Sequence, residues 1–146
     1  MTLKPIAAVI VALGVGSAGT AYAADALTRD AYKAEKDRID AQYKSAKQAC
    51  NSFKGNAEDV CKAEAEAEQR TAEAELDARN KGTVEAHQKA RIVRAEAQYK
   101  VAREKCDDLA GNAKDVCVKE AKAAETKAKA EAKANGRVAE ARTDAK

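Results

Sequence analysis

The 146-residue chain contains very few large apolar residues, and this scarcity limits what it can fold into. It has no Trp, one Met, one Phe, one Pro and four Tyr, so aromatic residues make up 3% of the sequence. From Ala24 onward, Leu, Ile, Val and Phe together number only 13 of 123 residues. A core this poor cannot enclose a deep, dry pocket. We therefore expect no catalytic activity and no cofactor.

Alanine and charged residues make up most of the chain instead: from Ala24 onward there are 31 Ala, 26 Lys or Arg and 24 Asp or Glu. Chains rich in Ala, Glu, Lys and Arg form long helices, because Ala is the best helix former. Acid–base pairs at i,i+4 spacing add about 0.2–0.5 kcal/mol each. Eight such pairs occur, namely Asp40/Lys44, Glu58/Lys62, Glu66/Arg70, Glu75/Arg79, Glu85/Lys89, Glu96/Lys100, Asp115/Lys119 and Glu125/Lys129.

The N-terminus has the pattern of a secretory signal peptide. An uncharged apolar run over 6–19 follows a short positive start with Lys4. Small residues at the −3 and −1 positions favour cleavage between Ala23 and Ala24, so we predict that residues 1–23 are removed. The alternative is an uncleaved anchor, which the shortness of the run disfavours. We expect no stable membrane insertion after cleavage, and a periplasmic or secreted protein in an oxidising compartment.

A segment of 21 residues, 41–61, recurs as 97–117 at a fixed offset of 56 residues. Twelve of the 21 positions are identical without a gap. The matched stretches include AQYKSAKQAC with AQYKVAREKC, and GNAEDVC with GNAKDVC. Such similarity indicates one supersecondary unit used twice.

Each unit has the pattern of two helices joined by a turn, because heptad-like apolar spacing precedes the Gly-Asn pair. Gly55 and Gly111 are expected to end the first helix of each unit in the left-handed conformation. The residues expected to cap the next helix are Asn56 and Asn112, with Asp59 and Asp115 three residues later. The predicted helices span 28–53, 57–79, 84–109 and 113–134, with Thr83 capping the third and Asn135-Gly136 ending the fourth. The first hairpin covers 24–82, the second covers 83–136, and 137–146 is predicted to be a flexible tail.

The four cysteines are placed symmetrically about these turns. Cys50 and Cys61 are equidistant from one Gly-Asn pair, and Cys106 and Cys117 are equidistant from the other. Residues equidistant from the bend of a helical hairpin lie at the same height on facing helices, so we predict the disulfides Cys50–Cys61 and Cys106–Cys117. The fold expected is all-α: tandem disulfide-stapled αα-hairpins in an elongated or loose bundle.

Two functional interpretations of the cysteines are less favoured. A zinc site usually pairs cysteines two to four residues apart, which this spacing does not match, so we expect no metal. A redox-active pair is normally spaced C-x-x-C. Structural bridges suit a small domain with too little core.

Charge is unevenly distributed along the chain. Residues 58–79 hold eight acidic and three basic side chains, whereas 114–133 hold six basic and four acidic ones. Either both helices have solvated faces, or these oppositely charged helices lie side by side within a molecule or between molecules. The Lys-rich segment includes glutamates and no aromatic residue for stacking, so we expect no nucleic-acid partner. His87 is the single histidine and is expected to be a surface residue.

The signal peptide followed by repeated Tyr-Lys-x-Ala-Lys and Gly-Asn-Ala-x-Asp-Val-Cys units resembles a set of small exported Ala/Lys/Glu-rich proteins of Gram-negative bacteria, some of them labelled TolA-like. The resemblance covers about 32–134. It implies an exported helical protein of the cell envelope. The TolA label rests on similar Ala/Lys/Glu composition in the helical periplasmic spacer of that envelope protein.

These features favour a non-catalytic periplasmic or cell-envelope protein with a structural or protein-interaction role. Its expected partner is another protein, or a second copy bound through helix faces. The alternative is a stress-induced periplasmic chaperone or adaptor that binds unfolded or envelope proteins.

Overall fold

The computed structural model describes residues 27–145, which form four long α-helices. They are α1 (Arg29–Ala49), α2 (Asn56–Lys81), α3 (Val84–Cys106) and α4 (Gly111–Asp144), and a short 3-10 turn, Cys50–Ser52, follows α1. The prediction of an all-α chain built from two stapled hairpins is confirmed. The predicted signal peptide and its cleavage between Ala23 and Ala24 lie outside the described residues.

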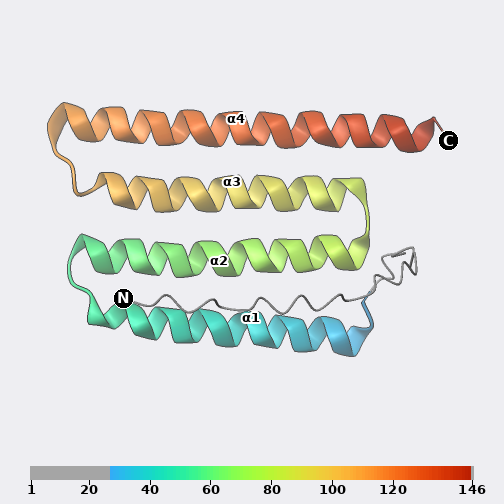
Figure 1. Cartoon of the computed structure of the whole chain (residues 1–146), viewed down its shortest axis with the longest axis horizontal. Helices are drawn as coiled ribbons and strands as arrows, with labels where there is room; N and C mark the ends of the chain where they lie inside the picture. Colours follow the sequence, from blue (N-terminus) through green and yellow to red (C-terminus); the bar gives the residue numbers. More distant parts are fainter. Residues whose placement is uncertain (1–26, 146) are drawn as a thin grey trace, which may run out of the picture.

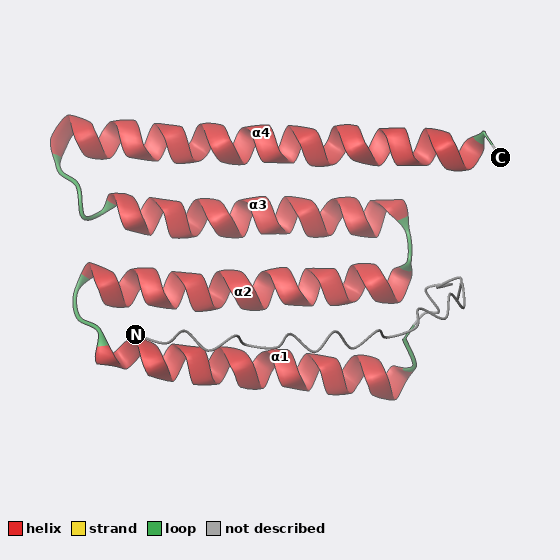
Figure 2. Ribbon diagram, viewed as in Figure 1, coloured by secondary structure: helices red, strands yellow, loops and turns green. Residues whose placement is uncertain are grey.

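The four helices lie side by side in one layer, antiparallel and in chain order (Figure 1). Each helix packs only on its neighbours in sequence, and within residues 27–145 no other pair of helices is in contact. The two hairpins pack together through α2 and α3, the most extensive of the three interfaces. The turns within the hairpins lie at one end of the layer, and the α2–α3 turn lies at the other (Figure 2). The loose bundle expected from sequence is therefore an open layer with α1 and α4 at its edges.

Alanine forms most of the buried core. Of ten buried apolar residues, six are alanines, and the largest fully buried side chains are Leu76, Cys50 and Cys106. Small side chains allow helix axes to approach closely, since interaxial distance depends on the side chains at the contact. The layer is thus held by close backbone approach and by the two disulfides rather than by a thick apolar core.

Net charge alternates across the first three helices. The helix α2 carries eight acidic and four basic side chains, and lies between α1 with four acidic and six basic ones and α3 with three acidic and six basic ones. Opposite charge on neighbouring helices favours this order. The acidic α2 and the basic α4 do not lie side by side within the molecule, because α3 separates them. That version of the charge-pairing prediction is wrong.

Only two of the eight i,i+4 pairs expected from sequence are formed as ion pairs in the described residues: Glu58–Lys62 at 2.6 Å and Glu125–Lys129 at 3.6 Å. Other acids from that set pair across interfaces instead. Glu66 contacts Lys100 at 2.9 Å, and Glu75 contacts Arg94. The close antiparallel packing brings α3 within reach of the acids on α2, so these side chains pair between helices.

Threonine begins two of the helices. The Thr28 hydroxyl accepts a hydrogen bond from the Ala31 N–H at 3.2 Å, and the Thr83 hydroxyl accepts one from the Ala86 N–H at 3.1 Å. The cap predicted at Thr83 is confirmed. Gly82 ends α2 in the left-handed conformation, with φ 63° and ψ 12°.

The predicted asparagine caps are wrong. Asn56 is the first residue of α2, its amide nitrogen is buried without a hydrogen-bond partner, and Gly55 occupies the cap position. Asn112 lies inside α4, which begins at Gly111 and has Ala110 at its cap position. Gly55 (φ 59°) and Gly111 (φ 55°) do adopt positive φ, but each lies at the start of the following helix rather than the end of the preceding one.

Of the two acidic residues predicted near these caps, one lies in the first turn of its helix and the other does not. Asp59 lies in the first turn of α2, where its charge suits the positive end of the helix. The first turn of α4 contains no acidic residue, because this helix begins one residue earlier than the repeat implies and Asp115 falls beyond the turn.

The helix α4 is longer than predicted. It continues through Asn135 and Gly136 to Asp144, so the expected stop there and the tail over 137–146 are wrong as far as Asp144. Gly136 is buried against the side chain of Gln88 on α3. The helix continues through this glycine because the packing of α4 along α3 outweighs the low helix propensity of one residue.

Candidate binding surface

A hollow of about 560 Å³ lies across α1, α2 and α3. We call it the arginine groove, and it is lined by Glu35, Arg38, Ile39, Ala72, Glu75, Ala78, Arg79, His87, Ala90, Arg91 and Arg94. Its lining comes from the first half of α1, the second half of α2 and the first half of α3, with α2 between the other two. These parts of the helices lie towards the end of the layer away from the hairpin turns, as Figure 1 lets the reader follow.

Small and apolar side chains form part of the groove lining. Ile39, Ala78 and Ala90 are all buried. Since alanine extends little beyond the backbone, the helices leave space between the longer side chains around them. The alanines that let the helices pack closely thus also form the floor of the groove, and no helix of residues 27–145 covers this floor.

Two glutamates hold three of the groove arginines. Glu35 pairs with Arg38 on its own helix at 2.6 Å and with Arg79 on α2 at 3.5 Å. The hydrogen bonds from Arg38, and the charge of Arg79, keep the pKa of Glu35 below its usual range. Glu75 on α2 pairs with Arg94 on α3. These contacts fix guanidinium groups from three helices around one hollow.

Arg91 and His87 differ from the other cationic groups of the groove. Both are exposed, and neither has an ion pair or a side-chain hydrogen bond within residues 27–145. They lie one helical turn apart on α3, so both side chains reach the same side of that helix. Four arginines against two glutamates leave the lining with a formal charge of +2 when His87 is neutral.

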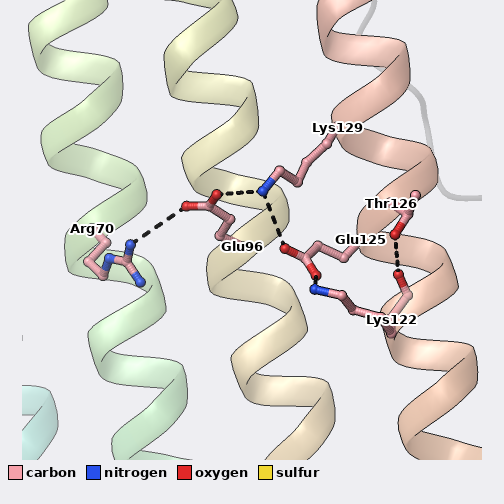
Figure 3. Close-up of polar contacts among 6 residues, drawn as sticks. All are labelled: Arg70, Glu96, Lys122, Glu125, Thr126 and Lys129. Atoms are coloured by element: carbon pink, nitrogen blue, oxygen red, sulfur yellow. Dashed lines mark hydrogen bonds and ion pairs between the residues drawn. The ribbon is translucent and has the colours of Figure 1, made fainter.

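A second polar feature links three helices through consecutive ion pairs (Figure 3). Glu96 on α3 contacts Arg70 on α2 at 4.0 Å and Lys129 on α4 at 2.7 Å. Lys129 also contacts Glu125 at 3.6 Å, and Glu125 accepts a hydrogen bond from Lys122 at 2.7 Å. The network ties both hairpins together.

Glu125 is the buried member of this network, with 7% of its surface exposed. The hydrogen bond from Lys122, together with the charge of Lys129, holds the pKa of Glu125 below its usual range. The hydrogen bond to Glu96 raises the pKa of Lys129. Each shift favours the charged form, which stabilises the ion pairs at neutral pH.

Both predicted disulfides are present. Cys50 bonds to Cys61 with the Cα atoms 5.5 Å apart, and Cys106 bonds to Cys117 with the Cα atoms 5.7 Å apart. They staple the hairpin turns at one end of the layer, whereas the groove lies towards the other. The four cysteines therefore hold the fold and do not line the groove.

The arginine groove was not predicted from the sequence. The signal that could have found it is the placement of arginine: Arg38, Arg79, Arg91 and Arg94 fall near the α2–α3 end of the layer once the helices are paired antiparallel. His87 was expected to be at the surface, and it is exposed. Its position in a groove depends on α1 and α2 packing beside α3, which sequence spacing alone does not give.

Comparison with known proteins finds no matching family model, no matching curated protein and no matching solved structure. Among the helices of residues 27–145, none is both long and apolar enough to cross a membrane. The same residues contain no group of three or more His, Cys, Asp or Glu side chains placed to hold a metal ion.

Proposed function

We propose that the chain is a non-catalytic structural or protein-interaction protein of the bacterial cell envelope. The observation that carries this proposal is the single layer of helices, which leaves the groove on α1, α2 and α3 uncovered. A closed bundle of four helices would bury its inner faces against one another. An open layer instead presents a broad face on which a partner can pack, and a disulfide staples each of its two hairpins.

The chemistry of the groove supports binding rather than catalysis. Its lining contains no Ser, Thr, Cys or Lys nucleophile, and its histidine, His87, has no side-chain partner in the described residues that would orient or activate it. Its carboxylates, Glu35 and Glu75, are held by arginines. Paired groups on a shallow, open surface suit recognition of another charged surface.

Two features support an exported location. Disulfides persist in oxidising compartments such as the periplasm, and all four cysteines are paired. The apolar run over 6–19 behind Lys4 has the pattern of a secretory signal peptide. We therefore place the proposed role in the periplasm, with secretion as the alternative.

The chaperone alternative has less support. The exposed large apolar side chains in the described residues are Phe53, Leu109, Val116 and Val138. Phe53, Leu109 and Val116 lie in or beside the hairpin turns, and Val138 lies near the end of α4. None of them lines the arginine groove. Binding of unfolded clients generally needs a large exposed apolar surface, and four such side chains divided between the two ends of the layer offer little.

Site-specific photo-crosslinking in intact cells of the source organism tests the proposal. A photoreactive amino acid replaces His87 in the groove, and a matched variant carries it at Ala123, an exposed position on the edge helix α4. We expect discrete protein adducts from position 87, identifiable by mass spectrometry, and few from position 123. Absence of any protein adduct from position 87 would contradict the proposed interaction role.

A further inference from the structure

The cationic groups of the arginine groove are only partly neutralised. Glu35 and Glu75 engage Arg38, Arg79 and Arg94, whereas Arg91 and His87 have no acidic partner within the described residues. A guanidinium group donates two parallel hydrogen bonds to a carboxylate, so an exposed, unpaired arginine beside other arginines suits an anionic group.

From this arrangement we infer that the groove binds an acidic segment of a partner protein, with a carboxylate of that segment on Arg91. The inference rests on the proposed interaction role and specifies the partner's chemistry. Carboxylates on a polypeptide are spaced apart, and the groove offers separated positive charges, because Glu35 already engages Arg38 and Arg79, and Glu75 already engages Arg94. A dense polyanion would meet repulsion from Glu35 and Glu75.

The lining also argues against nucleic acid. The groove contains no aromatic side chain on which a base could stack, and base–aromatic stacking is a main source of affinity for single strands. Instead, Ala72 is partly exposed in the lining, and the small buried side chains of Ala78 and Ala90 beside it leave room for a polypeptide backbone. A hollow of about 560 Å³ is in the size range of sites for drug-sized ligands, so it has room for a few residues of a segment.

The interface between α2 and α3 combines buried alanines with ion pairs between acidic and basic side chains, as the proposed complex would. Between α2 and α3, buried Ala78, Ala90 and Ala97 lie at the centre, and acids of α2 pair with bases of α3, as Glu66 does with Lys100. The groove offers alanines flanked by arginines with no helix above them. An Ala- and Glu-rich segment would complete this pattern.

Fluorescence anisotropy at low salt tests the inference with the purified, disulfide-bonded protein. The probe is a labelled peptide of six to eight alternating Glu and Ala residues, and the control peptide has Gln in place of Glu. Arg91→Gln removes the proposed carboxylate contact without breaking an ion pair. Arg103→Gln is the matched control, since Arg103 is also exposed and unpaired on α3 but lies outside the groove.

We expect the acidic peptide to bind and the Gln peptide not to bind. Arg91→Gln should weaken the acidic peptide's affinity by about fivefold or more, as expected for a charge-assisted hydrogen bond, and Arg103→Gln by less than about twofold. Equal effects of the two substitutions would overturn the inference, since they would show diffuse attraction without a site. Circular dichroism of both variants checks that the helices are intact.

Competition separates carboxylates from other anions. Tripolyphosphate should displace the peptide no better than NaCl at the same ionic strength, and displacement by micromolar tripolyphosphate would overturn the assignment to carboxylates. Failure of the peptide to bind wild-type protein would also overturn it. The crosslinking experiment remains independent, because a protein adduct at position 87 supports the interaction role even when the peptide fails.

Discussion

A single glycine determines where the turn between the two hairpins forms. Gly82 ends α2 in the left-handed region, and a Cβ placed there would meet no atom within 4 Å. Any penalty for a side chain at this position is therefore a backbone penalty alone. Gly136 is the opposite case, since it lies within α4 at an ordinary helical conformation and faces the side chain of Gln88.

Gly82→Ala should lower the free energy of unfolding by about 1 kcal/mol, because an L-residue is strained in the left-handed conformation. Urea denaturation followed by circular dichroism measures the change. Gly136→Ala is the control: alanine gains helix propensity there, and the flexible Gln88 side chain can move aside. We expect that control to leave stability unchanged or raised. Equal losses from both substitutions would contradict the role assigned to Gly82.

The pKa of Glu125 predicts a pH dependence of stability. Lys122 and Lys129 lower the pKa of this carboxyl in the folded protein. The stability it contributes is therefore present above the unfolded-state pKa of about 4.3, and is lost as pH falls through the lower folded-state pKa. Glu125→Gln should lower the free energy of unfolding at pH 7, and the difference from wild type should shrink below about pH 4.

Glu120→Gln is the matched control for this experiment, because Glu120 is exposed on the same helix and has no ion pair in the described residues. It should change stability little at either pH. Urea titrations at pH 7 and at acidic pH give both comparisons. A loss for Glu125→Gln that stays constant down to pH 3 would show that its charge is not the cause.

Among the elements, the hairpin turns carry the covalent constraint. Cys50 and Cys106 are almost fully buried, at 1% and 0% exposure, so the bridges are part of the core as well as links between helices. In both turns the bonded cysteines are 11 residues apart in sequence. The two loops are thus constrained to the same extent in the unfolded chain.

Replacing Cys106 and Cys117 together with Ala should cost about 3 kcal/mol, from the entropy that a loop of this length regains in the unfolded state. This is a large part of the stability of a small domain. Urea denaturation of the double variant measures the loss, and the Cys50→Ala, Cys61→Ala double variant should lose a similar amount. A loss below about 1 kcal/mol for both pairs would contradict the claim that the staples compensate for the thin core.

The helices themselves could be predicted from the sequence, but not all their ends. Composition and the symmetric cysteines were sufficient for four helices and two disulfides. The stop expected at Gly136 failed because the packing of α4 along α3 outweighs the low helix propensity of one glycine. The caps expected at Asn56 and Asn112 failed because Gly55 occupies the cap position of α2 and Ala110 that of α4. Neither helix has a side-chain hydrogen bond at its cap.

At the scale of the whole molecule, the arrangement of the helices was less predictable from the sequence than the helices themselves. Apolar spacing indicates which side of a helix is buried, but alanine-rich helices carry apolar groups on several sides and do not specify a closed bundle. Cross-helix pairs such as Glu75 with Arg94 depend on that arrangement. The arginine groove exists only because α1, α2 and α3 lie in one plane, so it could not be derived from spacing along the chain.

The open layer is the central claim, since the groove and the proposed interaction role both depend on it. The most direct test is the distance between two spin labels, measured by electron paramagnetic resonance. The labels replace Ser45 on α1 and Ala123 on α4, which are both exposed. Labels attached through non-natural amino acids leave the four cysteines bonded. Three interhelical spacings of about 8–10 Å place the helix axes about 25–30 Å apart in the layer. A distance near that value is the predicted result, whereas a main population at about 10 Å, one spacing, would show a closed bundle and contradict the open layer.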